Sequence, residues 1–273
     1  MSGCGETDKV ITDVSKDFKV KNDALPVSVS NVPVDEPVKA PIAASSVVNT
    51  TTTDEDKKIK TDVLDKINKA KLPGQAKQYL PVLIYELDRG WHDSDTITRE
   101  RLAGIPNQES NWKVNAHLRT DREHGCGLGQ ATIAYNKDGS VRFDTIAELK
   151  KLDSSLSTWD WKDCTNAQFQ LRGMVLKTHS DSRQCYAIML DSKEAIACTA
   201  AKYNGGAGSI IKRTRLCNSD PNCNPRVWFD NLETKCAQSR VKAAGYGESF
   251  CEINSKYPSR VFEKSKPFIG LMN

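Results

Sequence analysis

The sequence contains no run of apolar residues that approaches the length of a transmembrane helix, and no hydrophobic core of a signal peptide is visible. It also contains no Cys-x-x-Cys pair of the kind that many structural zinc sites use, and no internal repeat. Its net charge of +4 is too small to indicate a class of partner. We expect no nucleic-acid partner. What remains is a chain of 273 residues, long enough for one large domain or two small ones.

Hydrophobic residues are scarce in the first 57 residues, which account for most of the low overall value of 38%. Residues 5–57 mix proline, valine, serine, threonine and charged residues without the period of a helix or a strand. Such a segment buries too little apolar surface to offset the entropy lost on ordering. We therefore predict a disordered tail or linker over residues 1–57 and a folded domain over residues 58–273.

The first residues, MSGCGE, resemble the end of a bacterial lipoprotein signal, in which the cysteine becomes the lipidated first residue. Under this interpretation Cys4 is a lipid anchor that tethers the protein to a membrane. The alternative is an ordinary start that contains a cysteine by chance.

The other eight cysteines all lie after residue 125, and an even number in one domain predicts up to four disulfides and an oxidising compartment. The alternative is a set of reduced structural thiols. Eight cysteines allow on the order of a hundred pairings, but the Asp-Pro turn inside CNSDPNC favours one bond between Cys217 and Cys223. The eight are Cys126, Cys164, Cys185, Cys198, Cys217, Cys223, Cys236 and Cys251.

One mixed cluster, His117, His124 and Cys126, contains residue types that bind zinc. It lies on a glycine-containing stretch and lacks a second close cysteine. We therefore predict neither a metal nor a cofactor.

Apolar residues recur at helical spacing through most of the chain after residue 58. Residues 94–110 read as one helix, with Ser94 or Asp95 as its N-cap and with Pro106 weakening its last turn. The pattern changes at HGCGLGQATIAYNKDGSVRF, which predicts a short hairpin that turns at Lys137-Asp138-Gly139. Helices then return, one of them ending at AKYNGG, and a cysteine-rich loop follows. The predicted fold is mainly α, an α+β helical bundle with a small β-hairpin.

Three short stretches carry the chemistry together: Glu109-Ser110, then GLGQ at residues 127–130, then AKYNGG at residues 201–206. In this order they resemble the motifs of the SLT-type lytic transglycosylases, relatives of goose-type lysozymes that cleave the glycan strands of peptidoglycan. The resemblance covers roughly residues 75–270, because the closing YPSRVFEKS is also similar to the last helix of the family. One departure is Gly129, where many members have methionine, and we expect it to open the floor of the cleft.

The resemblance implies a lysozyme-like fold in which the hairpin flanks the active-site cleft. It makes Glu109 the single general acid and base, which protonates the leaving oxygen and then accepts a proton from the muramic acid 6-hydroxyl as a 1,6-anhydro ring closes. Tyr203 matches the tyrosine that bonds this acid, with Asn204 beside it. Ser110 and Gln130 match residues that line the sugar-binding cleft.

Two other functions remain open. A hydrolytic muramidase would need a second carboxylate, for which Asp121 and Glu123 are the candidates. A wall-binding or virion structural protein would keep the fold without turnover. The expected partner is peptidoglycan in each case. The expected setting is the cell envelope or periplasm, or alternatively a bacteriophage virion or lysis enzyme.

Overall fold

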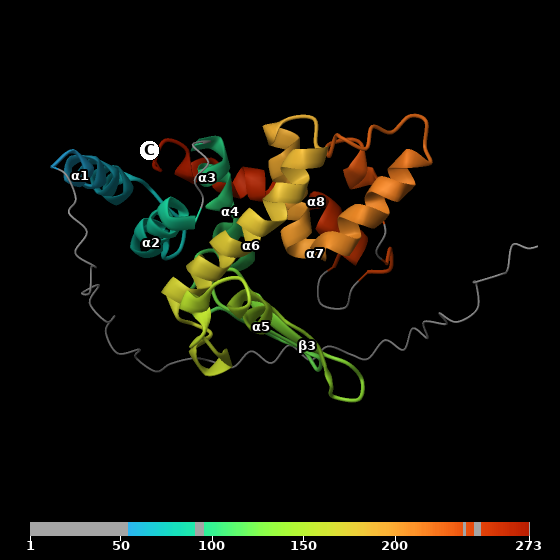
Figure 1. Ribbon diagram of the computed structural model, residues 1–273, viewed down its shortest axis with the longest axis horizontal. Helices are drawn as coiled ribbons and strands as arrows, with labels where there is room; N and C mark the ends of the chain where they lie inside the picture. The colour runs from blue at the N-terminus through green and yellow to red at the C-terminus, as the bar shows by residue number, and fades with distance from the viewer. Residues whose placement is uncertain (1–53, 91–95, 237–238, 243–246, 273) are drawn as a thin grey trace, which may run out of the picture.

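The computed structural model describes residues 54–90, 96–236, 239–242 and 247–272. Cys4, Ser94 and Asp95 lie outside the described residues, as does most of the expected tail. The described part is mostly helical with one small antiparallel sheet, which confirms the mainly α, α+β expectation (Figure 1). The first helix begins at Asp54, so residues 54–57 belong to it and not to the linker.

The longer helices are α1 (Asp54–Lys69), α2 (Ala76–Gly90), α6 (Ala167–Ile188), α7 (Ser192–Asn218) and α8 (Phe250–Ser265). The shorter ones are α3 (Thr96–Leu102), α4 (Gly104–Ser110) and α5 (Thr145–Lys150). None of the helices in the described part of the chain is both long and apolar enough to span a membrane.

The sheet has four antiparallel strands in the order β1-β2-β3-β4, where the sequence predicted one hairpin. The strands are β1 (His117–Arg119), β2 (Glu123–Cys126), β3 (Ala131–Tyr135) and β4 (Val141–Asp144). The predicted turn between β3 and β4 is confirmed, since Asp138 accepts hydrogen bonds from Ser140 and Gly139 has a φ of 83°. Strand β1 escaped prediction because its three residues are all exposed and show no alternation.

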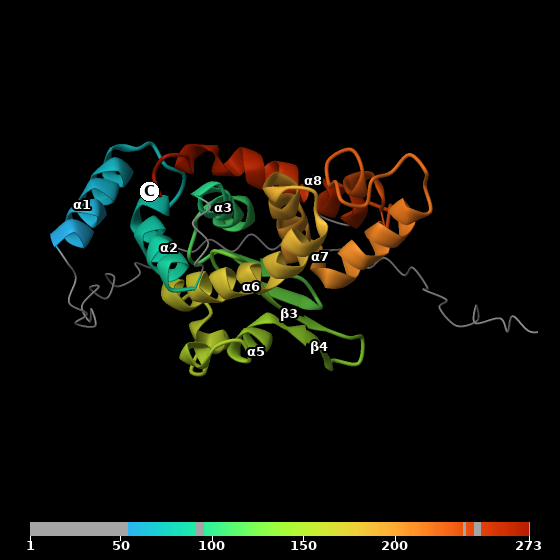
Figure 2. The same cartoon turned by 45° about the horizontal axis from the view of Figure 1, so that its top comes forward.

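Helix α6 packs against both α2 and α7, and the sheet with α5 lies on its other side (Figure 2). Helix α4 packs against α8, which joins the early and late parts of the chain. The largest hydrophobic cluster lies among these helices. It includes Leu80 and Leu83 of α2, Ile105 of α4, Leu171 of α6 and Val261 of α8.

The prediction of a single helix over residues 94–110 is wrong, because α3 ends at Leu102 and α4 begins at Gly104. The break seats α4 directly on α8. A Cβ at Gly104 would lie 2.4 Å from the carbonyl oxygen of Val261, so only glycine permits this approach. Asn107 then donates a hydrogen bond of 2.8 Å from Nδ2 to the carbonyl oxygen of Lys264. A tertiary contact, not local propensity, sets this boundary.

Helix α7 contains a non-helical residue at Gly206, with a φ of 73° and a ψ of 167°. The glycine turn predicted at the end of AKYNGG is therefore present. The prediction of a cysteine-rich loop directly after this turn is wrong in its first part. The chain is helical again as far as Asn218, and Cys217 lies within that helix.

All eight cysteines after residue 125 form disulfides, which confirms the prediction of an even, bonded set. The predicted bond between Cys217 and Cys223 is among them. The pairs are Cys126–Cys164, Cys185–Cys198, Cys217–Cys223 and Cys236–Cys251.

Candidate active site

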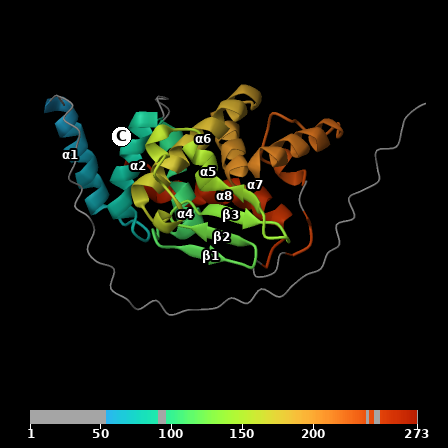
Figure 3. The same cartoon turned by 60° about the horizontal axis from the view of Figure 1, so that its bottom comes forward.

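Glu109 lies in the last turn of α4, a helix that lies next to the sheet in Figure 3. The chain leaves the helix through Asn111 and Trp112, which both have left-handed backbone conformations, with φ of 52° and 59°. Trp112 is fully buried in the main core and packs against Phe268. This buried anchor holds the end of α4, and with it the carboxyl group of Glu109, in a fixed place.

The carboxyl of Glu109 is only partly exposed and has two tyrosines as neighbours. Tyr257 of α8, 3% exposed, donates a hydrogen bond from its hydroxyl to Oε1 of Glu109. Burial raises the pKa of Glu109 to about 7, and the hydrogen bond from Tyr257 opposes part of that rise. The negative charge of Glu109 in turn helps to raise the pKa values of Tyr203 and Tyr257, after their own burial. Near neutral pH this glutamate can therefore both give and take a proton.

The prediction that Tyr203 donates a hydrogen bond to Glu109 is wrong. The hydroxyl of Tyr203 donates instead to the carbonyl oxygen of Gly129, at 2.7 Å. A Cβ at Gly129 would lie 2.7 Å from that hydroxyl oxygen. The tyrosine hydroxyl thus fills part of the space beside Gly129, and Gly129 and Tyr203 both line a cavity there. Glycine is needed here so that Tyr203 can reach the loop.

Hydrogen bonds from three sides hold the loop at residues 127–130 next to the end of α4. The hydroxyl of Ser110 donates to the carbonyl oxygen of Leu128 at 3.0 Å. The amide of Gln170, on α6, accepts from the backbone N–H of Leu128 at 2.5 Å and donates to the carbonyl oxygen of Cys164 at 2.5 Å. Gln130 donates from Nε2 to the carbonyl oxygen of Gly127 at 2.9 Å. Ser110 and Gln130 thus shape the loop itself.

Asn204 follows Tyr203 on α7 and has an exposed side chain. Its Oδ1 accepts a hydrogen bond of 3.1 Å from Nδ2 of Asn254, a buried residue of α8. Asn254 also donates to the carbonyl oxygen of Ala201 at 3.0 Å. Asn204 therefore belongs to a contact between α7 and α8, close to the segment that carries Tyr203.

The two proposed second carboxylates lie on the sheet side of the molecule. Asp121 is exposed in the turn between β1 and β2. Glu123 begins β2 and forms an ion pair of 2.7 Å with Arg142 on β4. Along the chain, residues 124–127 separate Glu123 from Leu128. Leu128 is the loop residue whose carbonyl oxygen accepts a hydrogen bond from Ser110, the residue next to Glu109. The structure thus gives Glu123 a partner other than the site.

The sequence nominated Glu109, Ser110, Gln130, Tyr203 and Asn204, but it did not nominate Tyr257 or Gln170, which the structure places against Glu109 and Leu128. Tyr257 lies in the stretch YPSRVFEKS, whose resemblance to a last family helix was the available signal. Gln170 gave no signal, because its role depends on a fold contact with residues 42 positions away.

No protein-family model matches this chain, and comparison with curated proteins finds no relative. The family resemblance therefore rests on the sequence motifs.

Proposed function

We propose that the protein is a peptidoglycan lytic transglycosylase. It would cleave the β-1,4 bond between N-acetylmuramic acid and N-acetylglucosamine and leave a 1,6-anhydro ring on the muramic acid. The observation that carries the proposal is the state of Glu109: a partly buried carboxyl with a pKa of about 7 and a tyrosine hydroxyl bonded to it. Glycosidases need such an acid, still protonated near neutral pH, on the leaving oxygen.

In the first half of the proposed reaction, the Glu109 carboxylic acid gives its proton to the glycosidic oxygen as the bond from the anomeric carbon breaks. The N-acetylglucosamine leaves with a new hydroxyl, and the anomeric carbon becomes cationic. Glu109 is now a carboxylate, which the hydroxyl of Tyr257 stabilises by its hydrogen bond.

In the second half, the 6-hydroxyl oxygen of the same muramic acid bonds to the anomeric carbon, and its proton passes to Glu109. The acid is restored and no water is consumed. A pKa near neutral suits a group that must act as acid and then as base.

Two observations support this reaction over hydrolysis. Burial raises the pKa of Glu109 and the Tyr257 hydroxyl lowers it in part, and no second carboxylate of the described residues contributes to the shift. Glu123 is paired with Arg142, and Asp121 is exposed in a turn. A hydrolase would need one of these acids to activate water across the sugar ring.

The proposed setting is the cell envelope. Four disulfides fit an oxidising compartment such as the periplasm, where peptidoglycan is also found. A lipid on Cys4 would tether the enzyme to the membrane. The alternative setting, a bacteriophage virion or lysis enzyme, would act on the same polymer.

The test is digestion of purified peptidoglycan, with the products analysed by mass spectrometry. Wild-type protein should leave 1,6-anhydromuramic ends, each lighter by one water than a hydrolytic end. Glu109→Gln keeps the shape but removes both proton transfers, so activity should fall by roughly 10²–10⁴-fold or more. Asp121→Asn and Glu123→Gln are the controls and should stay close to wild type. Reducing ends that require Asp121 or Glu123 would establish a muramidase, and an inert wild-type protein would overturn the proposed activity.

A further inference from the structure

Two histidines face each other on the sheet, beside the loop of the candidate site. Nδ1 of His117 lies 3.2 Å from Nε2 of His124, and the two rings stack with centroids 5.5 Å apart. His117 pairs with Cys126 across strands β1 and β2, and His124 lies two positions before Cys126. Because side chains on a strand alternate between faces, these three side chains share one face of the sheet.

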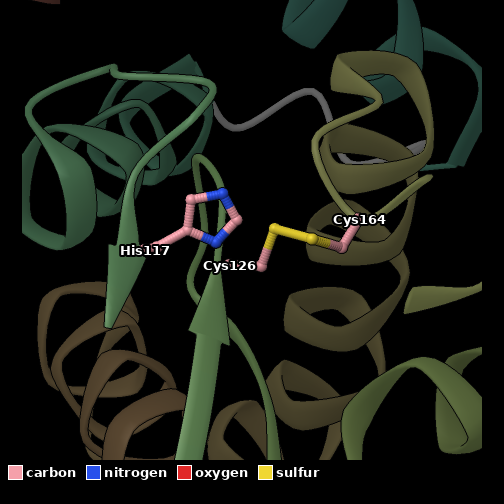
Figure 4. A group of neighbouring side chains, drawn as sticks. All are labelled: His117, Cys126 and Cys164. Carbon is pink, nitrogen blue, oxygen red and sulfur yellow. A yellow bond between two sulfur atoms is a disulfide. The ribbon is translucent and has the colours of Figure 1, made fainter. Parts of the chain in front are cut away.

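The disulfide partner Cys164 completes the group. A ring nitrogen of His117 and the sulfur atoms of Cys126 and Cys164 all lie within 4.8 Å of one another. Figure 4 shows the imidazole of His117 facing the disulfide. Cys126 and Cys164 are buried, at 0% and 4% exposure, whereas His117 is exposed at the edge of the group.

Two imidazoles and two thiolates are the ligand set of many tetrahedral zinc sites. With Zn–N of about 2.0–2.1 Å and Zn–S of about 2.3 Å, ligand atoms around one ion lie roughly 3.3–3.8 Å apart. The nitrogen pair of His117 and His124 already has nearly this separation. The sulfurs are in the wrong state, because a disulfide offers no thiolate. His124 lies beside His117 but outside the group of three, so its ring must move toward the sulfurs to complete the ligand set.

We propose that reduction of the Cys126–Cys164 bond converts His117, Cys126 and Cys164 into three ligands of a zinc ion, with the neighbouring His124 moving in as the fourth ligand of a Cys₂His₂ site. A dithiol reductant supplies two electrons and two protons and becomes a disulfide itself, while Cys126 and Cys164 become thiols. Zinc then displaces both thiol protons as it binds the two sulfurs.

The zinc ion would take over the structural role of the disulfide. Cys126 immediately precedes the loop at residues 127–130, and Cys164 lies 38 positions further along the chain. Either link ties the loop to the segment before α6. This proposal concerns a metal site and stands whether or not Glu109 performs the proposed reaction.

The test uses the full chain, reduced by a phosphine without air and titrated with Co²⁺, whose absorption reports tetrahedral thiolate ligation, followed by competition with Zn²⁺. The reduced wild type should bind one cobalt with thiolate charge-transfer bands, and the oxidised protein should lack those bands. The double variant His117→Ala with His124→Ala should lose about tenfold or more in affinity, since even changes to the partners of metal ligands cost 10–100-fold. His179→Ala, which removes a histidine of α6, is the matched control and should bind like wild type.

The dependence on histidine separates this site from the six other thiols that reduction releases. Cobalt bound equally well by the double variant would mean that those thiols bind it, and would overturn the proposal. A reduced wild-type chain that binds no cobalt, folded or unfolded, would overturn it as well. So would an oxidised chain that binds cobalt as tightly as the reduced one.

Discussion

The hydroxyl of Tyr257 donates a hydrogen bond to Oε1 of Glu109 across 148 positions of sequence. The bond is possible because α4 and α8 lie in direct contact, with glycine at position 104 where the two helices meet. It stabilises the charged form of Glu109, while burial stabilises the neutral form and has the larger effect. The balance of these two effects places the pKa near neutrality.

Removing the Tyr257 hydroxyl should raise the pKa of Glu109 further. Tyr257→Phe takes away the group that stabilises the carboxylate, and a hydrogen bond to a charged group contributes about 1.5–3 kcal/mol. The alkaline limb of the pH profile of kcat/KM should therefore move upward by about one to two pH units. Tyr203→Phe is the matched control, because its hydroxyl bonds Gly129 and not the acid. Equal shifts in both variants would contradict the assignment.

The raised pKa of Glu109 should also destabilise the protein as pH rises. Between the ordinary value of 4.5 and about 7, the native state holds a proton that the unfolded state has released. The free energy of unfolding therefore falls through this window, by at most about 3 kcal/mol and by less where solvent screens the charge. Glu109→Gln has no such proton. In urea titrations the variant should gain stability over wild type between about pH 4 and pH 8, and a constant difference would refute the shift.

Gly129 and Tyr203 should be energetically coupled. An alanine Cβ at position 129 would meet the Tyr203 hydroxyl oxygen at 2.7 Å, so Gly129→Ala should destabilise the protein by about 1–3 kcal/mol. In a Tyr203→Phe background that oxygen is absent, and the same substitution should cost less. A double-mutant cycle measured by denaturant unfolding gives the coupling energy directly. Additive effects would show that the two residues do not share this space.

The bond between Cys126 and Cys164 should matter for activity beyond its effect on stability. Replacing both cysteines by serine should cost about 2–4 kcal/mol of stability and lower kcat, because Cys126 adjoins the loop at residues 127–130. Replacing Cys185 and Cys198 by serine should cost a similar free energy with little change in kcat of the folded fraction. Assays at a temperature where both variants are folded separate the two effects. Equal losses of kcat would contradict a local role for the first bond.

Much of the fold followed from the sequence because the helices and the β3–β4 turn are specified locally, by apolar spacing and by the Asp-Gly turn. What failed depends on contacts between distant segments. Helix α3 stops at Leu102 because Gly104 must meet Val261, and residues so far apart leave no local pattern.

The candidate site shows the same division. Glu109 and Ser110 stand together in one motif and could be nominated from it. The choice between Tyr203 and Tyr257 as the partner of the acid depends on which helix meets α4, and that is a property of packing. The buried amide of Gln170 can form its hydrogen bonds with Leu128 and Cys164 only after the loop at residues 127–130 has packed against α6.

The four disulfides pair each cysteine with the next one along the chain, starting from Cys126. No bond spans another, so each closes a separate loop and none must wait for a later cysteine to arrive. If the chain crosses a membrane with its N-terminus first, the two cysteines of each bond reach the oxidising side before the cysteines of the next bond. If Cys4 carries the proposed lipid and so has no free thiol, oxidation of the successive thiols from Cys126 onward yields the native pairing. Folding in the proposed envelope setting would then need an oxidase but little help from an isomerase.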